Sequence, residues 1–96
     1  MQDDPIKSFR NAFKDFLKEE NLEHTYKQKQ LITNWEQIMG KTIASRTSKL
    51  FFKDKVLYIK VTSAPLRNEM LVAKPQIMEI LAREMGKKEV VDVRFL

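Results

Sequence analysis

Few residues of this chain have the types and spacing that metal binding or catalysis requires. His24 is the only histidine, and it follows Glu20 by four positions, so one helical face would present both side chains to a metal ion. Two ligands rarely hold a metal without a third, and we expect a solvated helix end here instead of a metal site. The chain has no cysteine, which excludes a thiolate nucleophile, a disulfide framework and every metal site built on Cys.

The sequence also shows no motif for a catalytic nucleophile or for a phosphate-binding loop. No Ser, Thr or Lys lies in a Gly-rich elbow, and Gly40 and Gly86 stand alone, so no glycine loop is present to cradle a phosphate. The acidic pair Asp3-Asp4 suits a helix cap better than a general acid–base pair. We therefore expect a protein that is not an enzyme, with no catalytic residue, no metal and no cofactor.

Basic residues gather in the middle of the chain. The 96 residues carry a net charge of +5, and residues 24–60 hold eight Lys/Arg against two Asp/Glu, whereas the two flanking segments are close to balance. Such an excess indicates an acidic partner, with nucleic acid first in line. Aromatic residues interleave with the lysines of residues 49–60 and would offer stacking to bases. The candidate nucleic-acid-binding residues are Lys27, Lys29, Lys41, Arg46, Lys49, Lys53, Lys55, Lys60 and Tyr58.

Two other interpretations of these residues stay open. Phe51 and Phe52 can be core residues while the lysines merely shield an edge strand, which is a common arrangement. The basic residues can also meet an acidic protein surface, which would make the chain an interaction adaptor without direct nucleic-acid binding. Trp35, at helical spacing from Leu31 and Ile38, is expected in the core and not at a partner interface.

Residues 1–24 predict an N-terminal amphipathic helix. Its apolar residues recur at helical spacing: Ile6, Phe9, Phe13, Phe16 and Leu17. Asp3 and Asp4 suit the helix start, and Asn21 suits its end. The aromatic stripe must cover the rest of the domain, a second copy or a partner, so a homodimer is one option. Phe9, Phe13 and Phe16 are the candidate partner-binding residues.

Residues 25–96 predict an α+β domain, so that the chain forms one compact domain overall. Thr25 is expected to cap a helix over about 26–39 that Gly40 ends, and one or two further turns follow over 41–47. Residues 50–53 and 56–62 then predict a hairpin that turns at 53–55. In the second strand Leu57, Ile59 and Val61 share the buried face.

The last third predicts a helical crossover and a closing strand. Ser63 caps a helix that continues to Gly86, and Pro75 is expected to kink it or to divide it into two helices. A strand over 90–96 follows, with Val91, Val93 and Phe95 on its inner face, parallel to the strand over 56–62. The expected order is α-α-β-β-α(kinked)-β, with a three-stranded mixed sheet covered by helices on one face.

The opening residues and the hydropathy pattern bear on location. No apolar run approaches the ~18–20 residues of a membrane span, and the acidic start differs from a signal peptide. We therefore expect a cytoplasmic protein without membrane contact.

Several segments in combination resemble the DciA family over about residues 26–96. They are Trp35-Glu36-Gln37-Ile38-Met39-Gly40, Ile43-Ala44 with Thr47, Leu57-Tyr58-Ile59-Lys60-Val61, Ser63-Ala64 with Leu66, Glu69 and Met70, and Val93-Arg94-Phe95. The resemblance implies a bacterial accessory protein of DNA replication that binds the replicative helicase and promotes its loading on DNA. It also implies a KH-like fold of the type II order.

The resemblance and the charge pattern together lead to one hypothesis. The chain is expected to bind the helicase and single-stranded or forked DNA without catalysing a reaction. Where nucleic-acid-binding KH domains carry a GXXG loop, this chain has residues 73–76 without glycine, so side-chain charge would have to replace the close approach of the backbone to phosphates.

Overall fold

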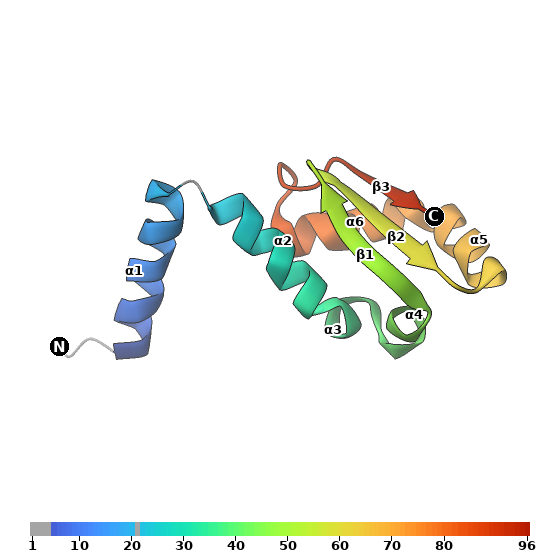
Figure 1. Cartoon of the computed structure of the whole chain (residues 1–96), viewed down its shortest axis with the longest axis horizontal. Helices are drawn as coiled ribbons and strands as arrows, with labels where there is room; N and C mark the ends of the chain where they lie inside the picture. Colours follow the sequence, from blue (N-terminus) through green and yellow to red (C-terminus); the bar gives the residue numbers. More distant parts are fainter. Residues whose placement is uncertain (1–4, 21) are drawn as a thin grey trace.

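A three-stranded mixed sheet and the helices packed on it form the body of the molecule (Figure 1). The computed structural model describes residues 5–20 and 22–96. Strands β1 (Thr47–Lys53), β2 (Val56–Val61) and β3 (Asp92–Phe95) lie in the order β1-β2-β3. β1 pairs antiparallel with β2, and β3 pairs parallel with β2. The predictions of an α+β chain, of a mixed sheet and of a parallel closing strand are confirmed.

The helices of the described residues precede the sheet and connect its second and third strands. They are α1 (Pro5–Glu19), α2 (Glu23–Thr33), α3 (Trp35–Met39), α4 (Lys41–Ser45), α5 (Ala64–Val72) and α6 (Lys74–Met85). Two parallel strands need a long crossover, and α5 and α6 together supply it between β2 and β3. None of these helices, within the described ranges, is long and apolar enough to span a membrane.

Local sequence explains how the crossover begins, divides and ends. The Ser63 side chain accepts a hydrogen bond from the backbone N–H of Leu66 at 3.3 Å, which caps α5. Pro75 lies in the first turn of α6, where its missing N–H costs no helical hydrogen bond. The division expected at this proline is confirmed as two helices that meet at Ala73. Gly86 ends α6 with φ at 100°, a conformation that favours glycine.

The segment before the sheet differs from the single helix expected over 26–39. α2 begins at Glu23, so Thr25 lies inside the helix and does not cap it, and α3 begins only at Trp35. The break falls at Asn34, whose φ of −97° and ψ of 16° end one helix and start the next. Asn has a low helix propensity, and Leu31 and Trp35, on either side of the break, are both buried in the core. Gly40 ends α3 as expected.

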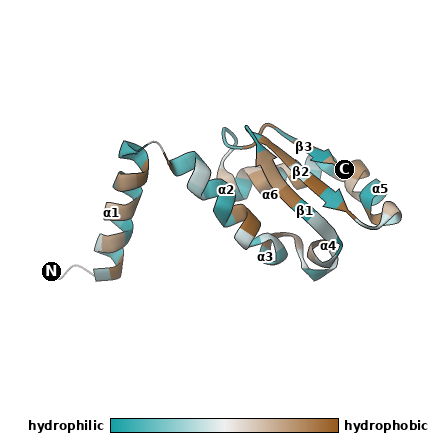
Figure 2. Ribbon diagram, in the orientation of Figure 1, coloured by the Kyte–Doolittle hydropathy of each residue, from teal (hydrophilic) through white to brown (hydrophobic). Residues whose placement is uncertain are grey.

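The core lies between the inner face of the sheet and the helices behind it. Its most deeply buried side chains are Leu57, Ile59, Leu81 and Val93. Trp35 belongs to this core, as expected, and its indole Nε1 donates a hydrogen bond to Thr47 Oγ1 at 3.1 Å. Figure 2 shows hydrophobic residues along β1 and β2, and along β2 buried residues alternate with more exposed ones, as a sheet covered on one face requires.

The prediction that Val91 lies on the inner face of the sheet is wrong. Its side chain is 61% exposed, while its neighbour Val90 is buried. The reason is that β3 starts only at Asp92. Val91 lies before it, beside the hairpin turn, where its backbone N–H donates a hydrogen bond to the Lys55 carbonyl at 2.9 Å. The strand, and with it the strict alternation between the two faces, therefore begins two residues later than expected.

Helix α1 projects from one end of the body and packs on α2 (Figure 1). Leu17 is buried there, and the Phe13 ring meets the Tyr26 ring edge-on at 5.2 Å between centroids. The radius of gyration is 15.8 Å, above the ~12–13 Å typical of a compact domain of this length. The amphipathic helix expected near the N-terminus is present. The cap expected at Asp3 and Asp4 and the stop expected at Asn21 lie outside the described residues.

Candidate nucleic-acid interface

The outer face of the sheet points away from the helices and from the core. Alternation along the strands sends Leu57, Ile59 and Val93 inward, and it sends their neighbours to the opposite side. We call this surface the open face. Its side chains are Lys49, Phe51 and Lys53 of β1, Val56, Tyr58 and Lys60 of β2, and Asp92 and Arg94 of β3.

Strand register arranges these side chains in rows across the sheet. Lys49 lies opposite Lys60, and Phe51 lies opposite Tyr58, which is paired on its other side with Arg94. The Phe51 and Tyr58 rings are stacked, with centroids 5.1 Å apart and planes 5° from parallel. Rows two residues apart along a strand are separated by about 7 Å. The open face therefore presents an aromatic row next to a row of two ammonium groups.

The two phenylalanines of β1 have different environments. Phe52 packs against the core, whereas the Phe51 side chain is 40% exposed on the open face. The interpretation of both as core residues is therefore wrong for Phe51. The reason is the period of two in a strand, which sends consecutive residues to opposite faces.

The lysines of the open face have no acidic partner within residues 5–20 and 22–96. Among the described residues, the ion pairs found do not include Lys49, Lys53 or Lys60. Two like charges directly across a strand pair repel one another, as Lys49 and Lys60 do here. An anionic group bound between them would relieve this repulsion.

The third strand is electrostatically balanced. Asp92 contacts Lys74 Nζ through Oδ1 at 2.7 Å and Arg94 Nε through Oδ2 at 3.2 Å. The hydrogen bond from Lys74, aided by the backbone N–H of Val93, holds the pKa of the Asp92 carboxyl below its usual value. Arg94 was missed as a candidate, although the alternation in 92–95 already indicated that it points outward. The unpaired positive charge of the open face therefore lies on β1 and β2.

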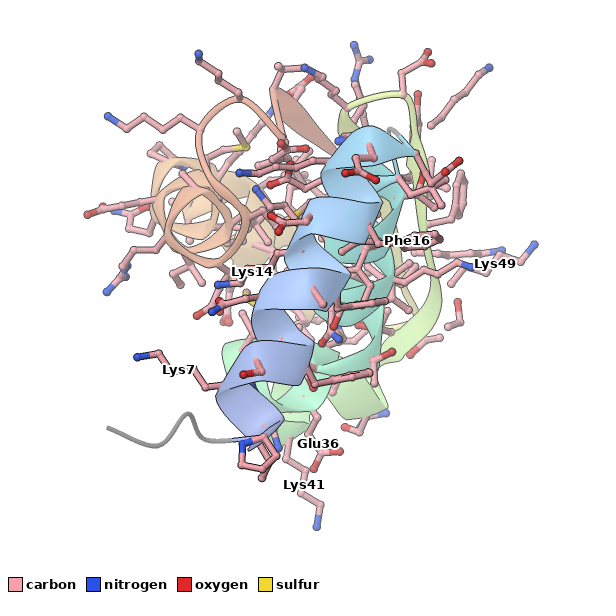
Figure 3. The ribbon with its side chains drawn as sticks, turned by 90° about the vertical axis from the view of Figure 1, so that its left-hand side faces the viewer. Lys7, Lys14, Phe16, Glu36, Lys41 and Lys49 are labelled. Atoms are coloured by element: carbon pink, nitrogen blue, oxygen red, sulfur yellow. The ribbon has the colours of Figure 1, made fainter. Side chains whose placement is uncertain are left out.

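The structure places the nine sequence-predicted residues in several locations. Lys49, Lys53, Tyr58 and Lys60 share the open face, and Lys55 belongs to the hairpin turn at its margin. Figure 3 shows the two side chains pointing in different directions, Lys41 downward from the start of α4 and Lys49 to the right.

The other predicted cations lie on or next to the helices. Lys29 is exposed on α2, and Arg46 follows α4 and leads into β1. Lys27 lies 3.6 Å from Glu23 and 3.7 Å from Glu89, measured from Nζ to a carboxylate oxygen. These contacts partly neutralise its charge. The structure therefore does not bring Lys27, Lys29 or Lys41 onto the open face.

His24 links α2 to the segment that precedes β3. Its Nδ1 is hydrogen-bonded to the Glu89 carboxylate, and its Nε2 lies 2.7 Å from Gln28 Nε2. Gln28 also donates to the Asp54 carbonyl in the hairpin turn at 2.8 Å. The bond from His24, together with the charge of Lys27, holds the pKa of Glu89 below its usual value against the opposing effect of burial. The expectation of a merely solvated helix end is therefore wrong for His24.

The described residues offer no ready metal centre. Within residues 5–20 and 22–96, no three or more His, Asp or Glu side chains are grouped so that they could hold a metal ion. His24 uses both ring nitrogens in contacts with the protein itself. Its observed role is to join α2 to the loop before β3.

The aromatic residues of α1 form a second exposed surface. The Phe9 side chain is 70% exposed and Phe16 is 48% exposed, whereas Phe13 is half-buried against Tyr26. The Phe9 ring stacks on Phe13, with centroids 6.2 Å apart. Figure 3 shows Phe16 on one side of the helix and Lys7 and Lys14 on the other. Of the three candidate partner-binding residues, Phe9 and Phe16 are therefore the most accessible.

Comparison with known proteins gives two matches. The model of the family described as "Dna[CI] antecedent, DciA" matches residues 8–95. The UPF0232 protein of Corynebacterium glutamicum (strain R) is 29% identical over 62 residues, which are 65% of this chain and 35% of that protein. The chain thus spans about a third of the length of this curated relative. No solved structure matches.

Proposed function

Because the chain belongs to the DciA family, we propose that it is a non-enzymatic accessory protein of bacterial DNA replication. In this proposal it acts in the cytoplasm, binds single-stranded or forked DNA on the open face, and contacts the replicative helicase so as to promote helicase loading. The family match over residues 8–95 supports the link to replication and to the helicase.

The open face is the observation that carries the DNA-binding part of the proposal. Three lysines without acidic partners among the described residues surround an aromatic pair of which one ring is 40% exposed. Phosphate contacts from Lys supply most of the affinity for nucleic acid, and aromatic rings supply stacking. An acidic protein surface would satisfy the lysines but would leave the exposed aromatic row without a role.

The proposal includes a KH-like fold. From α2 onward the described order contains helices, two strands, two helices and a closing strand, which is the order of a type II KH domain. The joint between α5 and α6 carries no glycine, and its Lys74 contacts Asp92 at 2.7 Å. That lysine is engaged within the protein. Phosphate contacts are therefore assigned to the open face and not to the joint between the helices.

A salt titration tests the DNA-binding part. If about five phosphates are neutralised, affinity for a fluorescein-labelled oligothymidylate should fall roughly 100-fold between about 50 and 200 mM salt. Fluorescence anisotropy measures this affinity directly. An affinity that does not change with salt would contradict the electrostatic account. Capture of the helicase without DNA binding at the lower salt concentration would favour the adaptor function instead.

A second prediction concerns α1. We assign its exposed aromatic residues to the helicase, and the double substitution Phe9→Ser/Phe16→Ser is expected to weaken binding to purified replicative helicase at least about 10-fold. Burying one such ring contributes about 1.5–3 kcal/mol. DNA affinity should remain unchanged, because neither residue lies on the open face. Biolayer interferometry with immobilised helicase measures the effect.

The matched control changes the other side of the same helix. Lys7→Ser/Lys14→Ser places the same residue type on α1 but leaves the aromatic rings intact (Figure 3). This variant should bind the helicase within about twofold of the wild type, since exposed charges contribute little. Phe9→Ser/Phe16→Ser could instead keep helicase binding and lose a dimer that the wild type forms in analytical ultracentrifugation. In that case the aromatic residues of α1 join two copies of the chain, and their assignment to the helicase is wrong.

A further inference from the structure

The aromatic row of the open face is an offset-stacked pair that leaves part of its ring surface uncovered. Cross-strand aromatic pairs stabilise hairpins, yet this pair lies on the side of the sheet away from the core. The Phe51 and Tyr58 planes are 5° from parallel with centroids 5.1 Å apart. Parallel rings in contact lie only about 3.5 Å apart, so the two rings are laterally offset. Each ring therefore has surface that its neighbour does not cover.

The surroundings leave part of this aromatic surface accessible. β1 is an edge strand, so no other strand of the described part of the chain lies beyond Phe51, whose side chain is 40% exposed. On the other side of the pair, Tyr58 is aligned with Arg94, and the Arg94 Nε lies 3.2 Å from an Asp92 carboxylate oxygen. A flat ligand can therefore reach the rings most easily from the β1 edge of the sheet.

Charge placement around the rings suits a nucleotide. Lys49 and Lys60 form the next row along the two strands, about 7 Å from the aromatic row. That spacing is of the order of the distance between a base and its own phosphate. At the opposite end of the face the single lysine, Lys53, shares its row with the Asp92 carboxylate, so only the row of Lys49 and Lys60 presents two ammonium groups without a carboxylate. The backbone of a bound strand would therefore cross Lys49 and Lys60, with its bases directed toward the rings.

We propose that Phe51 and Tyr58 form a stacking platform for unpaired bases of a single-stranded nucleic acid whose phosphates contact Lys49 and Lys60. This inference rests on the proposed function and adds the means by which the open face distinguishes single strands from duplex. Bases inside a duplex are already stacked on one another and expose no face to the rings. Every base has a π-face, so the platform tolerates any sequence.

An abasic oligomer separates stacking from charge. It has the phosphates of an oligothymidylate of equal length but lacks the bases. The wild type should bind the oligothymidylate at least about 10-fold more tightly than the abasic oligomer. Phe51→Leu and Tyr58→Leu should each remove most of this preference and leave the affinity for the abasic oligomer unchanged. Leucine keeps apolar packing on the sheet, and the retained abasic affinity shows that the variants are folded.

Two further variants complete the experiment. Phe51→Tyr restores an aromatic ring at the same position and should keep the preference for bases. Tyr26→Leu removes an exposed aromatic residue of α2, outside the open face, and should also keep it. Full preference for bases in Phe51→Leu would overturn the platform.

The wild type itself distinguishes failure of the inference from failure of the proposed function. Equal, salt-dependent affinity for both oligomers would overturn stacking and leave DNA binding by charge intact. Binding to neither oligomer would overturn both the inference and the proposed DNA binding.

Discussion

Replacing Lys49 and Lys60 together by glutamate is expected to weaken single-stranded DNA binding about 100-fold at about 50 mM salt. The two ammonium groups face each other across β1 and β2 and have no acidic partner among the described residues. Each lost phosphate contact costs nearly tenfold at this salt concentration, and the new carboxylates add repulsion. The slope of log affinity against log salt should become shallower by about 1.4.

Fluorescence anisotropy with two oligomers of different sequence measures both effects. The loss should be the same for each oligomer, since phosphate contacts carry no base information. The matched control is Arg67→Glu/Arg83→Glu, which changes the net charge equally on α5 and α6, in the helical layer. Its affinity should fall only a few-fold. Equal losses in the two double variants would mean that overall charge, and not the open face, governs binding.

Trp35→Ala is expected to lower the free energy of unfolding by about 3–5 kcal/mol. The side chain is only 5% exposed and lies in the core beside Leu31. Its Nε1 donates to Thr47 Oγ1 at 3.1 Å, and that hydroxyl donates to the Ile43 carbonyl at 2.7 Å. The substitution therefore leaves a cavity and also removes the link from α3 to the start of β1. Such a loss is a large fraction of the stability of a small domain.

Urea unfolding followed by far-UV circular dichroism measures this change, because the variant has no tryptophan for fluorescence. Trp35→Phe keeps much of the apolar volume and loses the hydrogen bond, so it should cost less than Trp35→Ala. Ile32→Ala removes a side chain that is 38% exposed in the neighbouring helix and should cost under about 1 kcal/mol. A Trp35→Ala variant as stable as Ile32→Ala would show that the indole does not hold the core together.

Several elements followed from local sequence alone. Alternation from Val56 to Val61 predicted both the strand and its buried face, and Ser63 and Gly86 predicted the ends of the crossover. These signals act within a few residues, so they do not depend on the rest of the molecule. The break at Asn34 was missed because helical periodicity continues unchanged through that position: Leu31 and Trp35, four residues apart, both belong to the core.

The candidate site was only partly predictable. The local excess of lysine and the aromatic residues of 49–60 indicated the region, but charge counts along a chain do not say which side chains share a surface. By residue type, Lys27 is as good a candidate as the other lysines. The structure places it beside Glu23, one helical turn away, and beside Glu89, which is distant in sequence. Likewise, His24 had no visible partner in the sequence until the loop before β3 brought Glu89 to it.

The amino-acid sequence by itself determined the class of the fold, the buried face of the central strand, the absence of cysteine chemistry and the basic character of the middle segment. Each of these depends on residue type and short-range period. Only the tertiary structure decided that Lys49 faces Lys60, that Phe51 stacks on Tyr58, and that Lys41 points elsewhere. The physical reason is that strand register and helix packing are set by burial of the whole core, which no local stretch of sequence contains.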